Sequence, residues 1–481
     1  MRLSVPDAVS SALKQLPASA VSCGACLHEA LETLEQWIST LCIDELMAAE
    51  ALLRGVHAYG TDTTESYGEL LDRSSAVRLI LSCHRSGYIR EAAVRRLAQS
   101  NELQVLPFLL LRVNDWVPQV CEVAKKAVLA RVHDRNANEF VRCLPLVERL
   151  RRAHRSDHDN LLAAIDALVL SRAENLYETL RHGPPRIRRF VFLLLTRNHD
   201  SNAVREGLAN DDPLIRLEAM RLVPATFPAT EAEQLLRSAT EDRSARVRTE
   251  ALSHFLGDRA LLERMLFDRN ANLRDFARFH LREAGIDFAA RYRAAITPIA
   301  PPKQLAVAIG GLAATGSAKD AETLRPYLAH LSTSARRAAV KAVMRLDGAR
   351  SVDAVAPLLL DPLPSVSAAA RDALRPQVAL LDLGELFTRT AALHARRNVV
   401  QLMNGASKWR SIALLLEALQ HPDVAELARD KIEYWNRSYN RSQTVPSRGE
   451  LRAFGLALVR ARHLLGDPLF EDLHALIRVY A

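Results

Sequence analysis

Two histidines and two cysteines have spacings that could serve chemistry. His154 and His158 stand four residues apart, the spacing at which two imidazoles on one helix can chelate a metal ion. Arg155, however, replaces the glutamate of the H-E-x-x-H motif, and the segment RRAHRSDHDN is typical of a polar turn. Cys23 and Cys26 form a single C-x-x-C, whereas a structural zinc needs two more ligands at comparable spacing, and no second C-x-x-C follows. We interpret the cysteine spacing as coincidence and leave a redox or metal role open.

Other arrangements that could do chemistry are weaker. Gly310 and Gly311 lie in a helical segment without a P-loop or dinucleotide pattern, so helix packing is their expected use. A nucleophile with a positioned histidine leaves no local signature, because such groups assemble in space. We therefore predict no catalytic residue, no metal and no cofactor.

The composition is that of an ordinary folded chain. Hydrophobic residues make up 49% and charged residues 25% of the 481 residues, with a mean hydropathy of −0.05. No stretch approaches the roughly 20 apolar residues of a membrane helix, and the beginning lacks a basic-then-apolar signal pattern. We expect a cytoplasmic protein without membrane association.

The formal charge of +8 and pI of about 9.3 could indicate an anionic partner such as nucleic acid. Only eight of the 64 basic residues are lysines, a skew that codon bias can produce. Fifty-six acidic residues are interspersed among the basic ones, which weakens the argument for phosphate binding.

An internal repeat determines which elements must position any functional residue. A triplet of apolar residues at i, i+4 and i+8, with a small residue usually in the middle, returns about every 30 residues and forms one stripe of a helix. The triplets are Ile89/Ala93/Leu97, Val120/Ala124/Val128, Ile187/Val191/Leu195, Ile215/Ala219/Val223, Val247/Ala251/Phe255, Leu273/Ala277/Leu281, Ala335/Ala339/Val343 and Val366/Ala370/Leu374. Weaker ones are Leu161/Ile165/Val169, Leu305/Ile309/Ala313, Ala395/Val399/Met403 and Val424/Ala428/Ile432.

A second amphipathic segment precedes nearly every triplet, and turns rich in Asp, Asn, Gly and Pro separate the two. Asp can cap the following helix and Pro can begin it, as in Asp212-Pro213 and Asp361-Pro362. No stretch shows sustained period-two alternation of β-branched residues. The sequence therefore predicts an all-α chain of helical hairpins.

The repeated phrase resembles that of HEAT-repeat proteins. Asp242/Val247/Arg248/Ala251 and Asp268/Leu273/Arg274/Ala277 fit the pattern D-x-x-x-x-V-R-x-x-A, which is similar to the short bacterial type named after phycobilisome-lyase-like repeats. The resemblance covers roughly residues 70–435. It implies an α-solenoid of about 12–14 hairpins, an architecture that says little about function.

Some HEAT-like families are enzymes, and their signatures are incomplete here. HEAT-like hydroxylases use repeated His-Glu pairs to bind iron, but His28-Glu29 is the one such dipeptide in the sequence. Phycobilin lyases and HEAT-like alkylpurine DNA glycosylases remain as analogies. Trp116, Trp409 and Trp435 could supply the aromatic side chains of a glycosylase and Asp115 its acid, although no motif of that family is reproduced.

We predict three regions. Residues 1–69 follow the repeat poorly and are interpreted as a helical N-terminal cap, which an open stack requires. Residues 70–435 form the solenoid, with a possible bend at 297–302, where the sequence reads TPIAPP. Residues 436–481 form a C-terminal capping helix pair, which Ser447 and Glu450 begin as a capping box.

Arginines divide into two sets. One set follows the first triplet residue and is expected to pair with a turn aspartate of a neighbouring repeat, as a ladder of charge-assisted hydrogen bonds: Arg90, Arg188, Arg216, Arg248, Arg274 and Arg336. Second helices of HEAT pairs line the concave surface, so other arginines could form rows there. The candidate binding residues are Arg95, Arg96, Arg151, Arg155, Arg189, Arg246, Arg278, Arg337 and Trp116.

The favoured function is a non-enzymatic scaffold that binds a protein partner along its concave surface. The alternative is a nucleic-acid-binding solenoid that uses the arginine rows.

Overall fold

The computed structural model describes residues 24–56, 64–153, 155–197 and 200–480, together with residues 6, 8, 9, 11 and 12. At a few helical positions within these ranges, among them 24–27 and 64–66, only the backbone is described. Every regular element in the described ranges is helical, and none of them is a strand. The all-α prediction is confirmed. The chain divides into two compact units, unit 1 (Met1–Ala251) and unit 2 (Leu252–Ala481).

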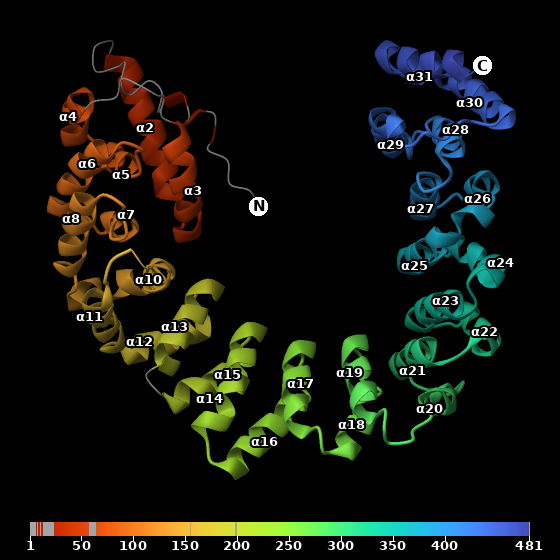
Figure 1. Ribbon diagram of the computed structural model, residues 1–481, viewed down its shortest axis with the longest axis horizontal. Helices are drawn as coiled ribbons and strands as arrows, with labels where there is room; N and C mark the ends of the chain where they lie inside the picture. The colour runs from red at the N-terminus through yellow and green to blue at the C-terminus, as the bar shows by residue number, and fades with distance from the viewer. Residues whose placement is uncertain are drawn as a thin grey trace. The chain divides into compact units, whose positions relative to one another are not determined.

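The helices of unit 1 run from α2, in the predicted N-terminal cap, to α17, whose last residue, Leu252, belongs to unit 2 (Figure 1). Its helices are α2 (Gly24–Thr40), α3 (Ile43–Val56), α4 (Thr64–Arg73), α5 (Ser75–Leu81), α6 (Gly87–Gln99), η1 (Leu103–Val105), α7 (Leu106–Arg112), α8 (Pro118–Leu129), η2 (Asp134–Asn136), α9 (Ala137–Arg142), α10 (Leu144–Arg151), α11 (Asp159–Leu170), α12 (Ala173–His182), α13 (Pro185–Arg197), α14 (Ser201–Ala209), α15 (Pro213–Thr226), α16 (Ala229–Ala239) and α17 (Ala245–Leu252).

Unit 2 continues the alternation of helices, several of which end in a 3-10 turn. Its helices are η3 (Ser253–Phe255), α18 (Arg259–Met265), α19 (Ala271–Leu281), α20 (Phe288–Ala295), α21 (Pro302–Thr315), α22 (Ala318–Leu324), η4 (Arg325–Ala329), α23 (Thr333–Asp347), η5 (Gly348–Ser351), α24 (Val352–Val355), η6 (Ala356–Leu360), α25 (Pro364–Leu374), η7 (Arg375–Leu380), α26 (Leu383–Arg389), α27 (Leu393–Met403), α28 (Lys408–Ala418), α29 (Ala425–Ser438), η8 (Tyr439–Arg441), α30 (Arg448–Ala461), η9 (Arg462–Leu464) and α31 (Asp467–Tyr480).

The apolar triplets face the core, as predicted. All twelve lie on helices or their immediate ends and are buried, except that Ile187, Phe255 and Ala313 are half-buried. One stripe per helix is removed from water, which is the main term that holds such hairpins together. The repeat assignment from the sequence is therefore confirmed within the described residues.

Close helix approach depends on small residues. A Cβ on Gly311 of α21 would lie 2.2 Å from the ring of Tyr292 in α20, and a Cβ on Gly207 of α14 would lie 2.5 Å from Phe192 in α13. A distance that short is a steric clash, so only glycine permits these contacts. The expected use of Gly311 in helix packing is confirmed.

Turn chemistry sets the helix ends. Asp212 caps α15 through its side chain, which accepts from the Leu214 amide, and Pro213 follows as the first residue of the helix. Ser447 and Glu450 form the predicted capping box at the beginning of α30.

The helices of unit 1 form two rows. The row that contains the triplet helix of each hairpin changes along the unit. The α7 row contains α7, α10, α13 and α15, since each contacts the next. The α8 row contains α6, α8 and α11, with α12 following α11. Figure 1 draws the two rows on opposite sides of unit 1. The triplet helices α6, α8 and α11 thus lie in one row, whereas the triplet helices α13 and α15 lie in the other.

The change of row lies between α11 and α13, because α12 follows α11 in the α8 row and α13 continues the α7 row. In unit 2 no such change occurs among the described helices, because α19, α21, α23, α25 and α27 contact one another in succession. There α28 contacts α30, and α29 contacts both α27 and α31.

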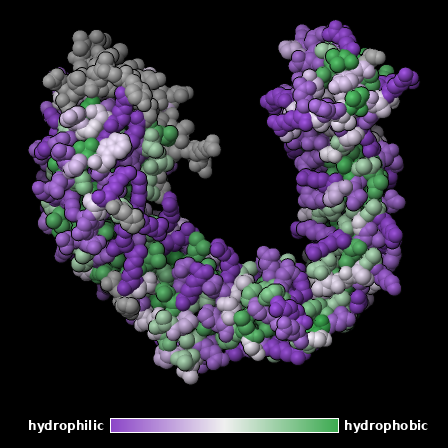
Figure 2. All heavy atoms as spheres, viewed as in Figure 1, coloured by the Kyte–Doolittle hydropathy of each residue, from purple (hydrophilic) through white to green (hydrophobic). Residues whose placement is uncertain are grey.

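Surface character is mixed in both units. On the face drawn in Figure 2, hydrophilic residues predominate and apolar residues form small separate patches. Within the described ranges, no helix combines the length and hydrophobicity needed to cross a membrane. The predicted limits of the two caps at residues 69 and 436, and the bend at 297–302, stay predictions.

Candidate ligand pocket in unit 1

The predicted ladder arginines share one bonding pattern. In Arg90, Arg216 and Arg336, Nη1 donates to the carbonyl oxygens six and five residues earlier, which fixes the turn before the helix. Nε and Nη2 then donate to an aspartate about one repeat later, at 2.8 and 3.0 Å from Arg216 to Asp242. Arg336 reaches Asp361 at 3.0 and 3.3 Å. At these positions the ladder prediction is confirmed.

One ladder position is displaced. Arg189, which the sequence placed among the candidate binding residues, donates from Nε to Asp212 at 2.6 Å. Arg188, the predicted ladder residue, instead directs Nη1 to the carbonyl of Arg181 at 3.5 Å, and its buried Nε has no partner. The prediction for Arg188 is wrong by one residue, because rotation by one position about the helix axis brings Arg189 to face the aspartate.

At Arg90 the ladder is completely buried. The side chains of Arg90 and Asp115 are both 0% exposed, and they form a bidentate pair at 2.9 and 2.7 Å. Asp115 also accepts from Arg112 Nη1 at 3.0 Å and from the amide of Val117. A carboxylate with this many donors is locked in place, so Asp115 cannot serve as a mobile acid.

A second carboxylate extends this pair into a cluster. Glu50, on α3, accepts from Arg112 Nη2, from Arg54 Nη2 at 3.2 Å and from both terminal nitrogens of Arg149 at 3.4 Å. Arg54 also lies 4.0 Å from Asp115. We call Glu50, Arg54, Arg90, Arg112, Asp115 and Arg149 the arginine cluster.

Helices α3, α7 and α10 add their charged residues to the pair that Arg90 of α6 forms with Asp115 of the turn after α7. Glu50 and Arg54 are four residues apart on α3 and therefore share one face of that helix. Arg112 ends α7, an apolar helix whose residues are all buried, and its charge must find partners inside the protein. Arg149 lies in the last turn of α10, which packs against both α3 and α7.

Burial and charge act in opposite directions on the two innermost groups. Burial raises the pKa of the Asp115 carboxyl, but hydrogen bonds from Arg90 and the Val117 amide, with the charges of Arg90 and Arg112, hold that pKa below its ordinary value. Burial, with the like charge of Arg149, lowers the pKa of the Arg112 guanidinium to about 10 in spite of the attraction of Asp115. Both groups remain charged at neutral pH.

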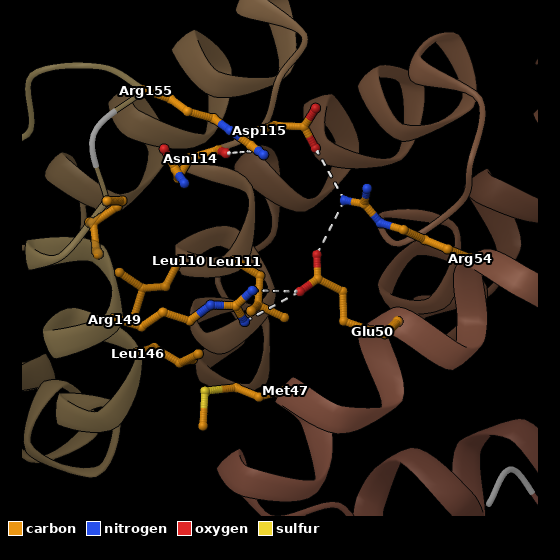
Figure 3. Close-up of a pocket in the computed structure, with 13 residues that line it drawn as sticks. Met47, Glu50, Arg54, Leu110, Leu111, Asn114, Asp115, Leu146, Arg149 and Arg155 are labelled. Atoms are coloured by element: carbon orange, nitrogen blue, oxygen red, sulfur yellow. Dashed lines mark hydrogen bonds and ion pairs between the residues drawn. The ribbon is translucent and has the colours of Figure 1, made fainter.

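A pocket of about 300 Å³ opens beside the cluster (Figure 3). Figure 3 shows Glu50 and Arg54 on one side of it, Arg149 on the other, and Asn114 and Arg155 joined near Asp115. Arg155 directs Nη1 to the carbonyl of Asn114 at 3.5 Å, while the buried Oδ1 of Asn114 has no partner. Apolar side chains complete the lining: Met47, Ala51, Leu110, Leu111, Leu146, Leu150 and Ala153.

Trp116 lies next to the cluster with 62% of its surface exposed. The guanidinium carbons of Arg54 and Arg90 lie 5.4 and 5.5 Å from its ring centroid, within the range of a cation–π contact. Trp409 and Trp435, by contrast, are buried in unit 2, where their indoles donate to backbone carbonyls. Their suggested use as glycosylase-like surface aromatics is therefore wrong.

Of the predicted binding residues, Arg155 and Trp116 lie at the pocket or beside the cluster. Most of the others pair with acids: Arg95 with Glu91, Arg96 with Asp72, Arg151 with Glu148 and Asp166, Arg189 with Asp212, and Arg278 with Asp275. Arg246 and Arg337 are exposed. Arg95 and Arg96 lie on α6, in the α8 row, whereas Arg189 lies on α13 in the α7 row, so these residues do not form a single row.

The other sequence candidates for chemistry contribute little. Cys23, the side chain of Cys26, and His154 lie outside the described residues. His158 is buried, with Nε2 3.2 Å from Ser156 Oγ and Nδ1 without a partner. Among the described side chains, no three of the His, Cys, Asp and Glu type gather as metal ligands.

The sequence interpretation missed Glu50, Arg54 and Arg112 as site residues. Two signals were present: an acid–base pair at i, i+4 in the apolar stretch LMAAEALLRGV, and a lone arginine at the end of LPFLLLR. Neither indicates which distant partner the charge will meet, because Glu50 and Arg112 are 62 residues apart.

No protein-family model matches this chain, and no curated protein matches it in sequence. Among solved structures, importin beta is similar over 97% of this chain and 68% of its own length, at 12% identity and a TM-score of 0.38. The Kap95:Nup1 complex gives a match over 97% of this chain and 67% of the other, at 11% identity and a TM-score of 0.38. A chain from microtubule polymerases with TOG domain arrays matches with a TM-score of 0.24. Similarity at these TM-scores carries no argument about partner or activity, and the likeness to phycobilisome-lyase-like repeats stays a prediction.

Proposed function

We propose that this protein is a non-enzymatic scaffold of stacked helical hairpins that binds a protein partner, with the pocket between α3, α7 and α10 as an anchor point. The observation that carries the proposal is the unequal charge of the arginine cluster. Four guanidinium groups, of Arg54, Arg90, Arg112 and Arg149, share the two carboxylates of Glu50 and Asp115. Such an excess beside an apolar lining favours an amphipathic anionic group of a partner.

The position of the pocket supports this use. It lies on the α7 row, which continues through α10 to α13 and α15, so a partner seated at the pocket can extend along a continuous row of helices. The pairing of Arg95, Arg96, Arg151, Arg189 and Arg278 with acids reduces the positive charge available for a phosphate backbone. A protein partner is therefore favoured over nucleic acid.

The test compares capture of proteins from native lysate by the full chain and by two pocket variants. Arg149→Gln removes an exposed charge of the cluster, and Ala51→Trp fills the pocket from the exposed side of α3. We expect a specific protein to be captured by the unchanged chain and lost with both variants, but retained with Arg460→Gln, which replaces an exposed arginine of α30 that does not line the pocket.

Capture that is the same with all four proteins would contradict the pocket as the anchor. A gel shift with duplex DNA over a salt series covers the alternative. Tight binding with a steep loss of affinity as salt rises would show phosphate contacts and would favour the nucleic-acid function instead.

A further inference from the structure

The charge at the pocket mouth is the part of the cluster that a ligand can still use. Arg90 and Arg112 are buried and committed to Asp115, whereas the side chains of Arg54 and Arg149 are 33% and 55% exposed. Arg149 reaches Glu50 through two contacts of 3.4 Å, near the long limit of a hydrogen bond. Its donors can therefore turn to a better acceptor at small cost.

Two buried polar atoms in the same place lack partners. They are Nε of Arg112, whose side chain is 1% exposed, and Oδ1 of Asn114. Buried polar groups are nearly always hydrogen-bonded. Arg112 does not line the pocket, but Asn114 does, so its Oδ1 can accept a hydrogen bond from an N–H group of a bound molecule. Arg155 adds a further guanidinium at the rim, where it donates to the carbonyl of Asn114 at 3.5 Å.

The remaining lining is aliphatic. Met47 and Ala51 from α3 face Leu110 and Leu111 from α7, with Leu146 from α10 beside them. A group that fits must carry its negative charge close to a hydrocarbon segment, because the arginines and the leucines line one cavity of about 300 Å³. Nucleic-acid phosphates are flanked by polar sugars and do not meet this requirement.

We infer that the pocket recognises an acidic peptide segment in which a glutamate or aspartate is flanked by aliphatic residues. The peptide carboxylate accepts hydrogen bonds from Arg54 and Arg149, whose guanidinium groups already donate to the Glu50 carboxylate, and an aliphatic side chain enters between α3, α7 and α10. This inference rests on the proposed function, since it specifies the chemistry of the partner at the same site.

The experiment measures fluorescence anisotropy of a labelled, capped peptide Gly-Leu-Glu-Leu-Gly-Ser with the full chain. We expect saturable binding that weakens about tenfold or more when glutamine replaces the peptide's glutamate, because the charge-assisted bonds are lost. Arg149→Gln should weaken it to a similar degree, and Ala51→Trp should abolish it. Arg460→Gln, which replaces an exposed arginine of α30 outside the pocket lining, is the matched control and should leave affinity unchanged.

Equal binding of the glutamate and glutamine peptides, or undiminished binding by Arg149→Gln, overturns the inference. Inorganic phosphate that displaces the peptide as strongly as an unlabelled copy of the peptide would show a general anion site and would also overturn it. Circular dichroism melting of each variant shows whether it is folded, and Arg149→Gln replaces an exposed side chain, so its folding is expected to be preserved.

The two proposals fail in different ways. A protein captured from lysate only when the pocket is intact, together with no peptide binding, would support the scaffold function and reject the ligand chemistry. Peptide binding without any pocket-dependent capture would support the ligand chemistry and reject the scaffold function at this site.

Discussion

The same local motif has different surroundings in the two units. In unit 2, Arg336 of α23 pairs with Asp361 and with the carbonyls of its own turn, and both side chains are slightly exposed, at 13% and 9%. In unit 1, Arg90 of α6 makes the same contacts with Asp115 and with its own turn, but both side chains are completely buried. There Arg112, Glu50, Arg54 and Arg149 enlarge the pair into the arginine cluster.

The comparison shows that a repeat motif supplies a structural pair and that elements outside the motif turn it into a site. Glu50 and Arg54 come from α3, within the predicted N-terminal cap, and Arg149 comes from α10, one of two short helices between α8 and α11. Neither α3 nor α10 carries one of the apolar triplets of the repeat. Helices that depart from the repeat are therefore places where a solenoid can carry functional residues that its other repeats lack.

The largest expected effect is the loss of the buried carboxylate. Asp115→Ala should lower the free energy of unfolding by about 3–5 kcal/mol, because Arg90 and Arg112 are left buried without their shared partner. Asp361→Ala in unit 2 should cost less, about 1–3 kcal/mol, because Arg336 keeps its carbonyl bonds and some contact with water. Urea unfolding followed by circular dichroism measures both, and equal losses would contradict the distinction between the units.

A smaller effect is expected from acid. The folded-state pKa values of Asp115, Asp242 and Asp320 lie below their ordinary values, so the unfolded chain binds more protons than the folded one. The stability that these carboxylates contribute is present above pH about 4 and is lost as pH falls further, through the folded pKa values. The urea midpoint should therefore drop between pH 7 and pH 3.

Asp115→Asn provides the control for this dependence. It cannot titrate at position 115, so its midpoint, already lower at pH 7, should fall less on acidification than that of the unchanged chain. An identical drop in both proteins would show that Asp115 contributes nothing to the acid sensitivity.

The smallest effect belongs to the residue with the largest proposed role in binding. Arg149→Gln should change the free energy of unfolding by less than about 0.5 kcal/mol, because its side chain is half exposed and its contacts with Glu50 are long. Thermal unfolding measures this difference. A loss as large as that of Asp115→Ala would show that Arg149 is a structural member of the cluster and not its ligand-binding edge.

Much of the fold could be predicted from the sequence because repetition supplies the same signal many times. The triplets at Ile89, Ile215 and Val366 each place three residues on one helical stripe, and their burial depends only on local helix geometry. The capping box of Ser447 is likewise a local feature. The ladder pairs Arg216–Asp242 and Arg336–Asp361 were predictable because they join equivalent positions of adjacent repeats.

The arginine cluster could not be predicted in the same way. Glu50 meets Arg112 across 62 residues and Arg149 across 99, distances along the chain that no repeat period specifies. The packing of α10 against both α3 and α7 brings these residues together, and no local sequence pattern specifies that packing. The predicted rows of arginines, from Arg95 to Arg337, required all triplet helices to lie in one row. The triplet helices of unit 1 lie in two rows.

By itself, the sequence determined the helical hairpins, their buried stripes and the ladder pairs of Arg216 and Arg336, since all of these follow from spacing along one or two adjacent helices. Only the tertiary structure decided where positive charge exceeds negative charge. Four guanidinium groups meet two carboxylates in the arginine cluster because helices far apart in the sequence pack together there.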